Sequence, residues 1–210
     1  MEQIPYKNSN TITTELVPAL IACKKKIIEQ VNEMLQSPPS SPTLLLALDG
    51  RCGSGKSSLA LELAQELPLN LIHMDDYYLP MADRDPDWKK QFGKNMNFTR
   101  LIQEILQPAL KGEELLVRPY SCRYARYQDE VRLKPKPVTL IEGSYSLHPL
   151  LRDFYHYSIY LQCSDDTQRQ RLIAREGKRF PFYQELWIPL EDAYCKSSRP
   201  DSFASLTCCS

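Results

Sequence analysis

Apolar residues recur at helical spacing in the N-terminal part of the chain. Between positions 13 and 35 they fall on one side of a helix, and polar residues, including the lysines at 24–26, fall between them. The spacing predicts an amphipathic helix over residues 13–35, with its lysines on a solvated face. Residues 37–42 consist of prolines and serines and predict a linker. We therefore expect residues 1–42 to form a helix and a linker, and residues 43–210 to form one domain.

Short uninterrupted apolar runs dominate the rest of the pattern. Each run is bounded by polar or turn residues, and the runs cover residues 43–48, 69–73, 138–141 and 158–161. Helical patterns alternate with them at residues 58–67, at residues 97–110 and after Ser164, which can cap a helix. Uninterrupted apolar strands that alternate with helices are typical of a parallel sheet with helices on both faces. The pattern therefore predicts a three-layer α/β sandwich with a mainly parallel sheet.

Residues 113–133 have a different pattern from the rest of the chain. Leu115, Val117 and Tyr120 precede a run that is dense in tyrosine and arginine. Such a segment does not fit a strand buried on both faces, because its polar side chains would be desolvated there. We expect it to leave the sheet as a short two-stranded excursion and then to return to the core.

A glycine-rich turn joins the first apolar run to the helix that follows it. Its sequence over residues 50–57, Gly-Arg-Cys-Gly-Ser-Gly-Lys-Ser, matches the phosphate-loop (P-loop) pattern. The glycines let backbone amides converge on an anion at a helix N-terminus, while the lysine and the last hydroxyl reach the phosphates and their magnesium ion. We therefore expect ATP and Mg²⁺ as ligands. The predicted nucleotide-binding residues are Gly50, Arg51, Cys52, Gly53, Ser54, Gly55, Lys56, Ser57 and Ser58.

Acidic and aromatic residues follow the second apolar run. Asp75, Tyr77 and Tyr78 lie just beyond it, at the edge of a parallel sheet where ligands bind. Asp75 could accept the proton of a hydroxyl that attacks the γ-phosphate, with the tyrosines forming the wall of the acceptor pocket. The alternative is a turn capped by an aspartate, with tyrosines that fill the core.

Further candidates for the phosphates and the metal lie on the later elements. Glu142 directly follows a buried apolar run, so it reaches the same edge of the sheet and could hold the magnesium ion together with Ser57. Arg171 and Arg175 lie one helical turn apart and could clamp ATP from a lid. A solvated helix face is the alternative for both arginines, and it is our interpretation for Arg169.

Composition and charge narrow the range of functions. Lysine plus arginine and aspartate plus glutamate both number 26, so the chain lacks the excess of positive charge that nonspecific binding to nucleic acids or anionic membranes uses. We expect a small-molecule substrate and no nucleic-acid or membrane partner. The sequence leaves open whether the chain forms a homo-oligomer.

The seven cysteines and the apolar runs indicate the cellular compartment of the protein. The cysteines show neither a disulfide framework nor paired zinc spacing, and Cys208 and Cys209 lie in what we expect to be a frayed polar tail. The N-terminus lacks the pattern of a signal peptide, and no apolar run approaches the length of about 20 residues that a membrane span needs. These features predict a soluble protein in the cytoplasm.

Several motifs together carry a resemblance to a known family. They occupy residues 49–57, 75–78, 118–120 and 141–145. In this order and spacing the chain resembles the uridine kinase-like and phosphoribulokinase-like P-loop kinases, most of all the small bacterial proteins usually labelled uridine kinase. The resemblance covers about residues 44–194 and leaves the N-terminal helix outside it. It implies the P-loop NTPase fold, with the excursion at the acceptor site.

The resemblance also implies roles for single residues. Asp75 matches the catalytic base, Glu142 the acid of the magnesium site, and Tyr120 a residue of the acceptor pocket, while Arg171 and Arg175 match lid arginines. One departure concerns the excursion, where nucleoside kinases of the family carry a histidine and an arginine. Here the excursion contains arginines, among them the candidate Arg126, but no histidine lies between Tyr120 and Glu142.

These observations favour an ATP-dependent kinase that acts on a hydroxyl group of a nucleoside or related small metabolite. The departure on the excursion keeps a second enzyme open, a kinase of a sugar phosphate or vitamin precursor, in which Arg118, Arg123 and Arg126 would bind an anionic acceptor. A third hypothesis is a regulatory protein whose bound nucleotide orders a partner surface.

Overall fold

The central sheet is built from the uninterrupted apolar runs. In the computed structural model, which describes residues 16–37 and 41–210, five strands pair in parallel in the order β2-β7-β1-β8-β9. Their bounds are β1 Leu44–Gly50, β2 Leu69–His73, β7 Val138–Glu142, β8 Tyr157–Gln162 and β9 Leu206–Cys209. The runs expected from the sequence thus form β1, β2, β7 and β8, and the prediction of a mainly parallel sheet is confirmed.

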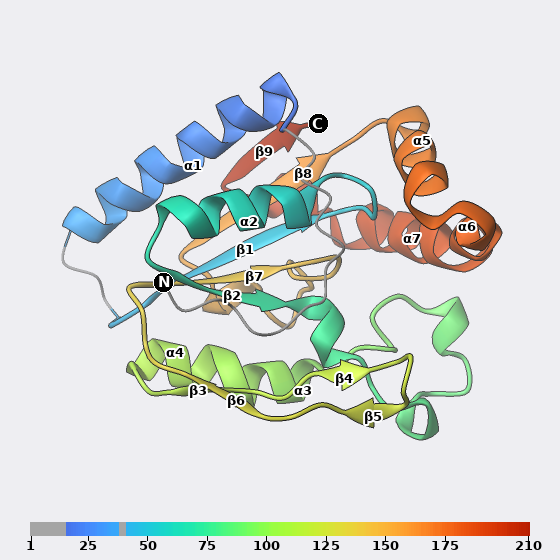
Figure 1. Cartoon of the computed structure of the whole chain (residues 1–210), viewed down its shortest axis with the longest axis horizontal. Coiled ribbons are helices and arrows are strands. Elements are labelled where there is room, and N and C mark those ends of the chain that lie inside the picture. Colours follow the sequence, from blue (N-terminus) through green and yellow to red (C-terminus); the bar gives the residue numbers. More distant parts are fainter. Residues whose placement is uncertain (1–15, 38–40) are drawn as a thin grey trace.

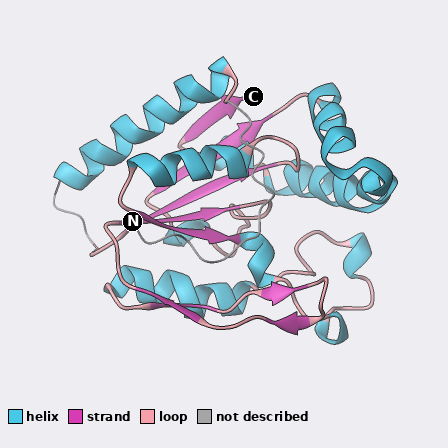
Figure 2. Cartoon of the chain, viewed as in Figure 1, coloured by secondary structure: helices cyan, strands magenta, loops and turns pink. Residues whose placement is uncertain are grey.

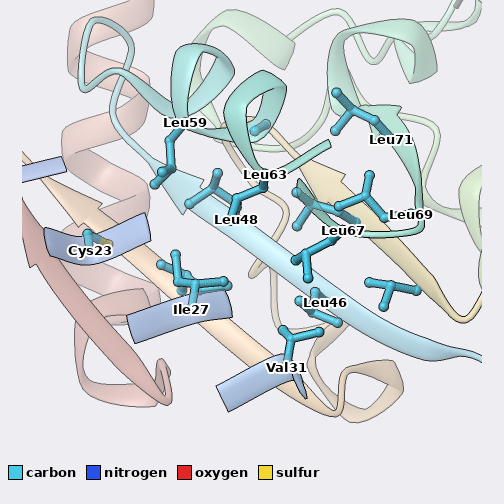
Figure 3. Packing of buried hydrophobic residues seen from close by; sticks show 14 of the residues in the cluster. Cys23, Ile27, Val31, Leu46, Leu48, Leu59, Leu63, Leu67, Leu69 and Leu71 are labelled. Atoms are coloured by element: carbon cyan, nitrogen blue, oxygen red, sulfur yellow. The ribbon is translucent and has the colours of Figure 1, made fainter. Parts of the chain in front are cut away.

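Helices cover both faces of this sheet (Figure 1, Figure 2). The bounds are α1 Pro18–Gln36, α2 Lys56–Glu66, α3 Phe98–Leu101, α4 Gln107–Lys111, α5 Asp165–Glu176, α6 Phe180–Phe182, α7 Ile188–Ser198 and α8 Pro200–Phe203. Leu46 and Leu48 of β1 pack against α1 and α2 (Figure 3), whereas Leu45 packs into the cluster formed with α3 and α4 on the other face. Successive side chains of a strand alternate between the two faces of the sheet, so a strand covered by helices on both faces must be apolar on both.

The helix predicted over residues 97–110 forms as one continuous segment with a local change of winding. Asn97 caps it by accepting the amide of Arg100 at 3.0 Å, and Gly112 ends it in a left-handed conformation. Between α3 and α4 the residues Ile102–Leu106 are π-helical. This wider turn ends two positions before Pro108, whose nitrogen has no hydrogen to donate and whose ring crowds the preceding turn.

The excursion predicted at residues 113–133 is confirmed. Here β3 (Leu115–Val117) pairs antiparallel with β6 (Val131–Leu133), and β4 (Tyr120–Ser121) pairs antiparallel with β5 (Arg126–Tyr127). Figure 1 shows these strands beside α3 and α4, away from the central sheet.

The N-terminal helix α1 packs on α2 and contributes to the same core as the sheet. Its buried residues include Leu20, Ile27 and Val31, and Lys24 forms ion pairs with Glu62 and Glu66 of α2, at 3.1 and 2.6 Å. The expected start of the helix at residues 13–15 and linker residues 38–40 lie outside the described residues. Every described helix is too short or too polar to cross a lipid bilayer.

The C-terminal segment differs from the expected frayed tail. It forms β9, which pairs with β8, and Cys208 is joined to Cys23 of α1 by a disulfide across 185 positions of the sequence. The prediction of a frayed tail without disulfides was therefore wrong. Four residues are too few for their alternation to be recognised, although Leu206 and Cys208 do face the core that α1 completes. The expected cytoplasmic location therefore loses the support that it drew from the lack of a disulfide framework.

Replacing Cys208 by serine is expected to lower the free energy of unfolding by about 2–4 kcal/mol, because the disulfide restricts a very long loop of the unfolded chain. Chemical denaturation of the oxidised protein would measure the loss. Cys209→Ser is a matched control, since this neighbouring thiol is exposed and free. Equal stability of the two variants would contradict a stabilising disulfide.

Candidate active site

The phosphate loop lies between the end of β1 and the start of α2, as its sequence predicts. At Gly50, a Cβ atom would lie 2.4 Å from the main-chain oxygen of Leu161 on β8, so no side chain fits. Gly55, with φ of 94°, turns the chain into α2 in a left-handed conformation that favours glycine. The loop thus forms a tight cradle at the N-terminus of a long helix, where backbone amides favour an anion.

Lys56 and Ser57 stand at the mouth of this cradle. The ammonium group of Lys56 donates to the main-chain oxygen of Arg51 at 3.0 Å, and the Ser57 hydroxyl lies 3.3 Å from both carboxylate oxygens of Glu142. Glu142 ends β7 and is only 4% exposed. These oxygen donors beside an anion cradle suit Mg²⁺ that accompanies a nucleotide, so the residues present fit both ligands.

Glu142 also contacts His73, a residue that the sequence did not single out. The strand register pairs His73 with Glu142 on the neighbouring strands β2 and β7, and the His73 Nδ1 atom lies in short contact with the carboxylate. A buried carboxylate needs such partners to offset its desolvation. No local motif marks this histidine, because its role depends on which strand lies beside β2.

A second buried carboxylate holds the strand that enters the loop. Asp49 accepts the amide of Gly50 at 2.6 Å, the amide of Leu147 at 2.8 Å and the hydroxyl of Tyr194 at 2.7 Å. Burial raises the pKa of Asp49 to about 6, although these donors oppose the increase by favouring the charged form. The bonds fix the position of Gly50, at the first turn of the phosphate loop, against the segment after β7.

A cavity of about 600 Å³ opens from the phosphate loop. The phosphate-loop residues that line it are Cys52, Gly53, Gly55, Lys56, Ser57 and Ser58, and other predicted site residues there are Asp75, Tyr78, Tyr120, Glu142 and Arg175. Segments that are far apart in the sequence therefore meet around one space. Ser54, by contrast, is fully buried inside the loop, and the Arg51 side chain turns away to Asp165 and Asp192.

Asp75 lies on the 3-10 turn Met74–Tyr77 that follows β2. Its carboxylate is exposed to the cavity and accepts the hydroxyl of Tyr78 at 3.3 Å. Tyr77, which we expected in the acceptor pocket, is instead 1% exposed and packs in the core, with the Arg100 guanidinium 4.4 Å from its ring centre. Neighbouring residues of so tight a turn point in different directions, so Tyr77 and Tyr78 diverge.

The predicted lid arginines also diverge. Arg175 lines the cavity beside Tyr183, whereas Arg171 donates to the main-chain oxygen of Gly53 at 3.1 Å and to the Ser210 hydroxyl at 3.0 Å. Arg171 thus touches the back of the loop. Arg169 packs against the ring of Phe180, with the guanidinium 5.2 Å from its centre.

Several aromatic side chains also line the cavity. Tyr120 lines it from β4, while Arg126 of β5 is exposed, lies near the ring of Tyr124 and stands outside the cavity lining. Trp88 and Trp187 complete the wall, with ring centres 6.1 Å apart. The tryptophans belong to no motif in the sequence, and their isolated positions gave no signal that they would meet.

Comparisons with known proteins agree with this architecture. No family model and no curated protein matches the sequence. Among solved structures, a possible uridine kinase from Bacillus stearothermophilus has a TM-score of 0.62 at 19% identity, over 87% of this chain and 98% of that chain. A candidate fructose transport system kinase from Silicibacter sp. TM1040 has a TM-score of 0.60 at 21% identity, over 90% and 98%.

A third solved structure, D-glycerate 3-kinase from Cryptococcus neoformans, has a TM-score of 0.55 at 15% identity, over 81% of this chain and 86% of that chain. At such low identity the likeness concerns the path of the chain rather than the choice of substrate. The similarity covers 81–90% of this chain in the three structures. The chain therefore has the P-loop NTPase α/β fold that these solved structures share.

Proposed function

We propose that the protein is an ATP-dependent phosphotransferase that moves the γ-phosphate of ATP to a hydroxyl group of a small metabolite, a nucleoside or a related compound. The observation that carries the proposal is the shared cavity. The phosphate loop and several aromatic rings line it together, and the Asp75 carboxylate is exposed to the same space. A donor and an acceptor could therefore be held together, with a base at hand.

Each of the candidate residues has a separate role in the proposed reaction. A bond forms between the acceptor oxygen and the γ-phosphorus, and the bond from that phosphorus to the bridging oxygen of ADP breaks. Asp75 takes the proton of the acceptor hydroxyl, and Lys56 stays beside the transferring phosphate. Mg²⁺, when bound, would offset phosphate charge, and Ser57 and Glu142 would hold it.

The aromatic wall favours an acceptor that carries a ring. Tyr78, Trp88, Tyr120 and Trp187 offer flat apolar surface, on which a nucleobase could stack. Flat rings gain contact area on such walls at little conformational cost, because neither partner has many torsions to fix. A nucleoside is for this reason our first choice of acceptor.

One feature favours a second candidate, an alcohol that also bears an anionic group. Arg84 and Lys89 both line the same cavity, with the Arg84 guanidinium 4.7 Å and the Lys89 ammonium group 5.8 Å from the ring centre of Trp88. Arg118 and Arg123, which we had considered for this task, are engaged elsewhere: Arg118 pairs with Glu104 at 3.1 Å, and Arg123 packs near Tyr124.

A panel of acceptors tests the proposal. ADP formation from MgATP would be followed with nucleosides, sugar phosphates, hydroxy acids and uncharged alcohols, and the phosphorylated product would be identified by mass spectrometry. We expect one class to stimulate ADP formation well above the basal rate. If ATP binds and no acceptor stimulates its turnover, the regulatory protein becomes the better hypothesis.

A further inference from the structure

Helix α7 is bonded along one side to the phosphate loop. The carboxylate of Glu191 accepts the main-chain amide of Cys52, with distances of 2.9 and 3.0 Å to its two oxygens. The next residue, Asp192, forms an ion pair with Arg51 at 2.9 Å. Tyr194, three positions after Glu191, donates its hydroxyl to the carboxylate of Asp49, which directly precedes the loop. The helix and the loop are thus connected at consecutive positions of each.

Glu191 also reaches the segment that follows β7. It accepts the hydroxyl of Ser144 at 2.6 Å, two positions after the candidate metal ligand Glu142. The Glu191 side chain is buried, with 4% exposure, yet it lines the cavity. A carboxylate is costly to bury, so hydrogen bonds that fix its position are needed to offset that cost. Through this one side chain, α7, the phosphate loop and the end of β7 meet.

The N-terminal part of the same helical segment contributes to the aromatic wall of the cavity, which we call the acceptor wall. A π-helical turn, Tyr183–Trp187, continues directly into α7, and both end residues of that turn line the cavity. Trp187 precedes Glu191 by four positions, so the two side chains lie on one side of the helix, about one turn apart. Trp187 directly precedes α7 (Figure 1), so a displacement of Glu191 would move Trp187 with the hydrogen-bonded helix.

We propose that Glu191 is a positioning residue that couples the phosphate loop to the acceptor wall. A nucleotide that settles in the loop changes the position of the Cys52 amide, Glu191 follows that amide, and α7 carries Trp187 to the place where it meets the acceptor. The inference rests on the proposed function in that it requires ATP to bind at the loop. The role is indirect: Glu191 acts through the backbone of the loop and through Trp187.

The tryptophans make this coupling measurable before the acceptor is known. The chain has two of them, Trp88 and Trp187. In a Trp88→Phe background, indole fluorescence reports Trp187 alone, and we expect added MgATP to change it. Glu191→Gln should bind MgATP and lose most of that change, because an amide cannot accept from the Cys52 amide with both of its terminal atoms. Calorimetry would measure nucleotide binding independently.

Glu185→Gln is the matched control, because it makes the same substitution at an exposed position of the same segment. It should keep the full fluorescence change. If Glu191→Gln fails to fold, Ser144→Ala removes one donor to the carboxylate and should reduce the change in part. A full fluorescence change in Glu191→Gln and in Ser144→Ala would overturn the inference. So would a protein with an intact Glu191 that binds MgATP without any fluorescence change. Failure of the wild type to bind MgATP would instead contradict the proposed function.

Discussion

Replacing Asp75 by asparagine is expected to lower the rate of phosphotransfer by about 10²–10⁴-fold, the usual contribution of a general base. Asparagine keeps the size and the hydrogen-bonding oxygen of the side chain but cannot take the proton of the acceptor hydroxyl. The 3.3 Å contact with Tyr78 should therefore survive, and the cavity should keep its shape. Steady-state kinetics with the acceptor from the panel would give kcat and KM, and calorimetry would give the affinity for ATP.

The expected result is a large fall in kcat with an unchanged affinity for ATP, because the proposed base would act on the acceptor and not on the phosphate loop. Asp83→Asn is the matched control, since Asp83 is an exposed aspartate on the next turn of the same segment and lies outside the cavity lining. Near-normal turnover of Asp75→Asn would remove Asp75 from the role of base and leave the proton acceptor to another group.

The fold follows from the sequence because its signals are local. An uninterrupted apolar run records a strand buried on both faces, and the phosphate-loop pattern records a backbone conformation that only certain residues adopt. Glu142 was predictable for the same reason, since its place directly after such a run puts it at the carboxyl edge of the sheet. These features need no knowledge of what lies beside them in space.

The rest of the site depends on contacts between distant segments. His73 acquires its partner from the strand order, Trp88 meets Trp187 across about 100 positions, and Glu191 reaches the loop only because α7 folds back over it. Spacing along the chain carries no record of such pairs. The disulfide of Cys208 was missed for the same reason, because its partner Cys23 lies far away in the sequence, on a helix without a motif of its own.

Replacing Glu142 by glutamine is expected to raise the Mg²⁺ concentration needed for half-maximal activity by about 10–100-fold, the range seen when a group that orients a metal ligand is lost. The amide carries no charge to attract a cation and presents one oxygen where the carboxylate presents two, both of them 3.3 Å from the Ser57 hydroxyl. Titration of activity with Mg²⁺ at fixed ATP would measure the shift.

Excess Mg²⁺ should restore part of the activity of Glu142→Gln, which separates a weakened metal site from a misfolded one. Glu113→Gln provides the control, because Glu113 is an exposed glutamate at the start of the excursion and the same substitution there should leave the titration unchanged. The substitution has two opposing effects on stability: it removes the cost of burying a charge, and it weakens the contacts of that charge with Ser57 and His73. Thermal unfolding of the variant should therefore be measured together with the titration. An unchanged Mg²⁺ dependence in a folded Glu142→Gln would show that the metal is held without this carboxylate.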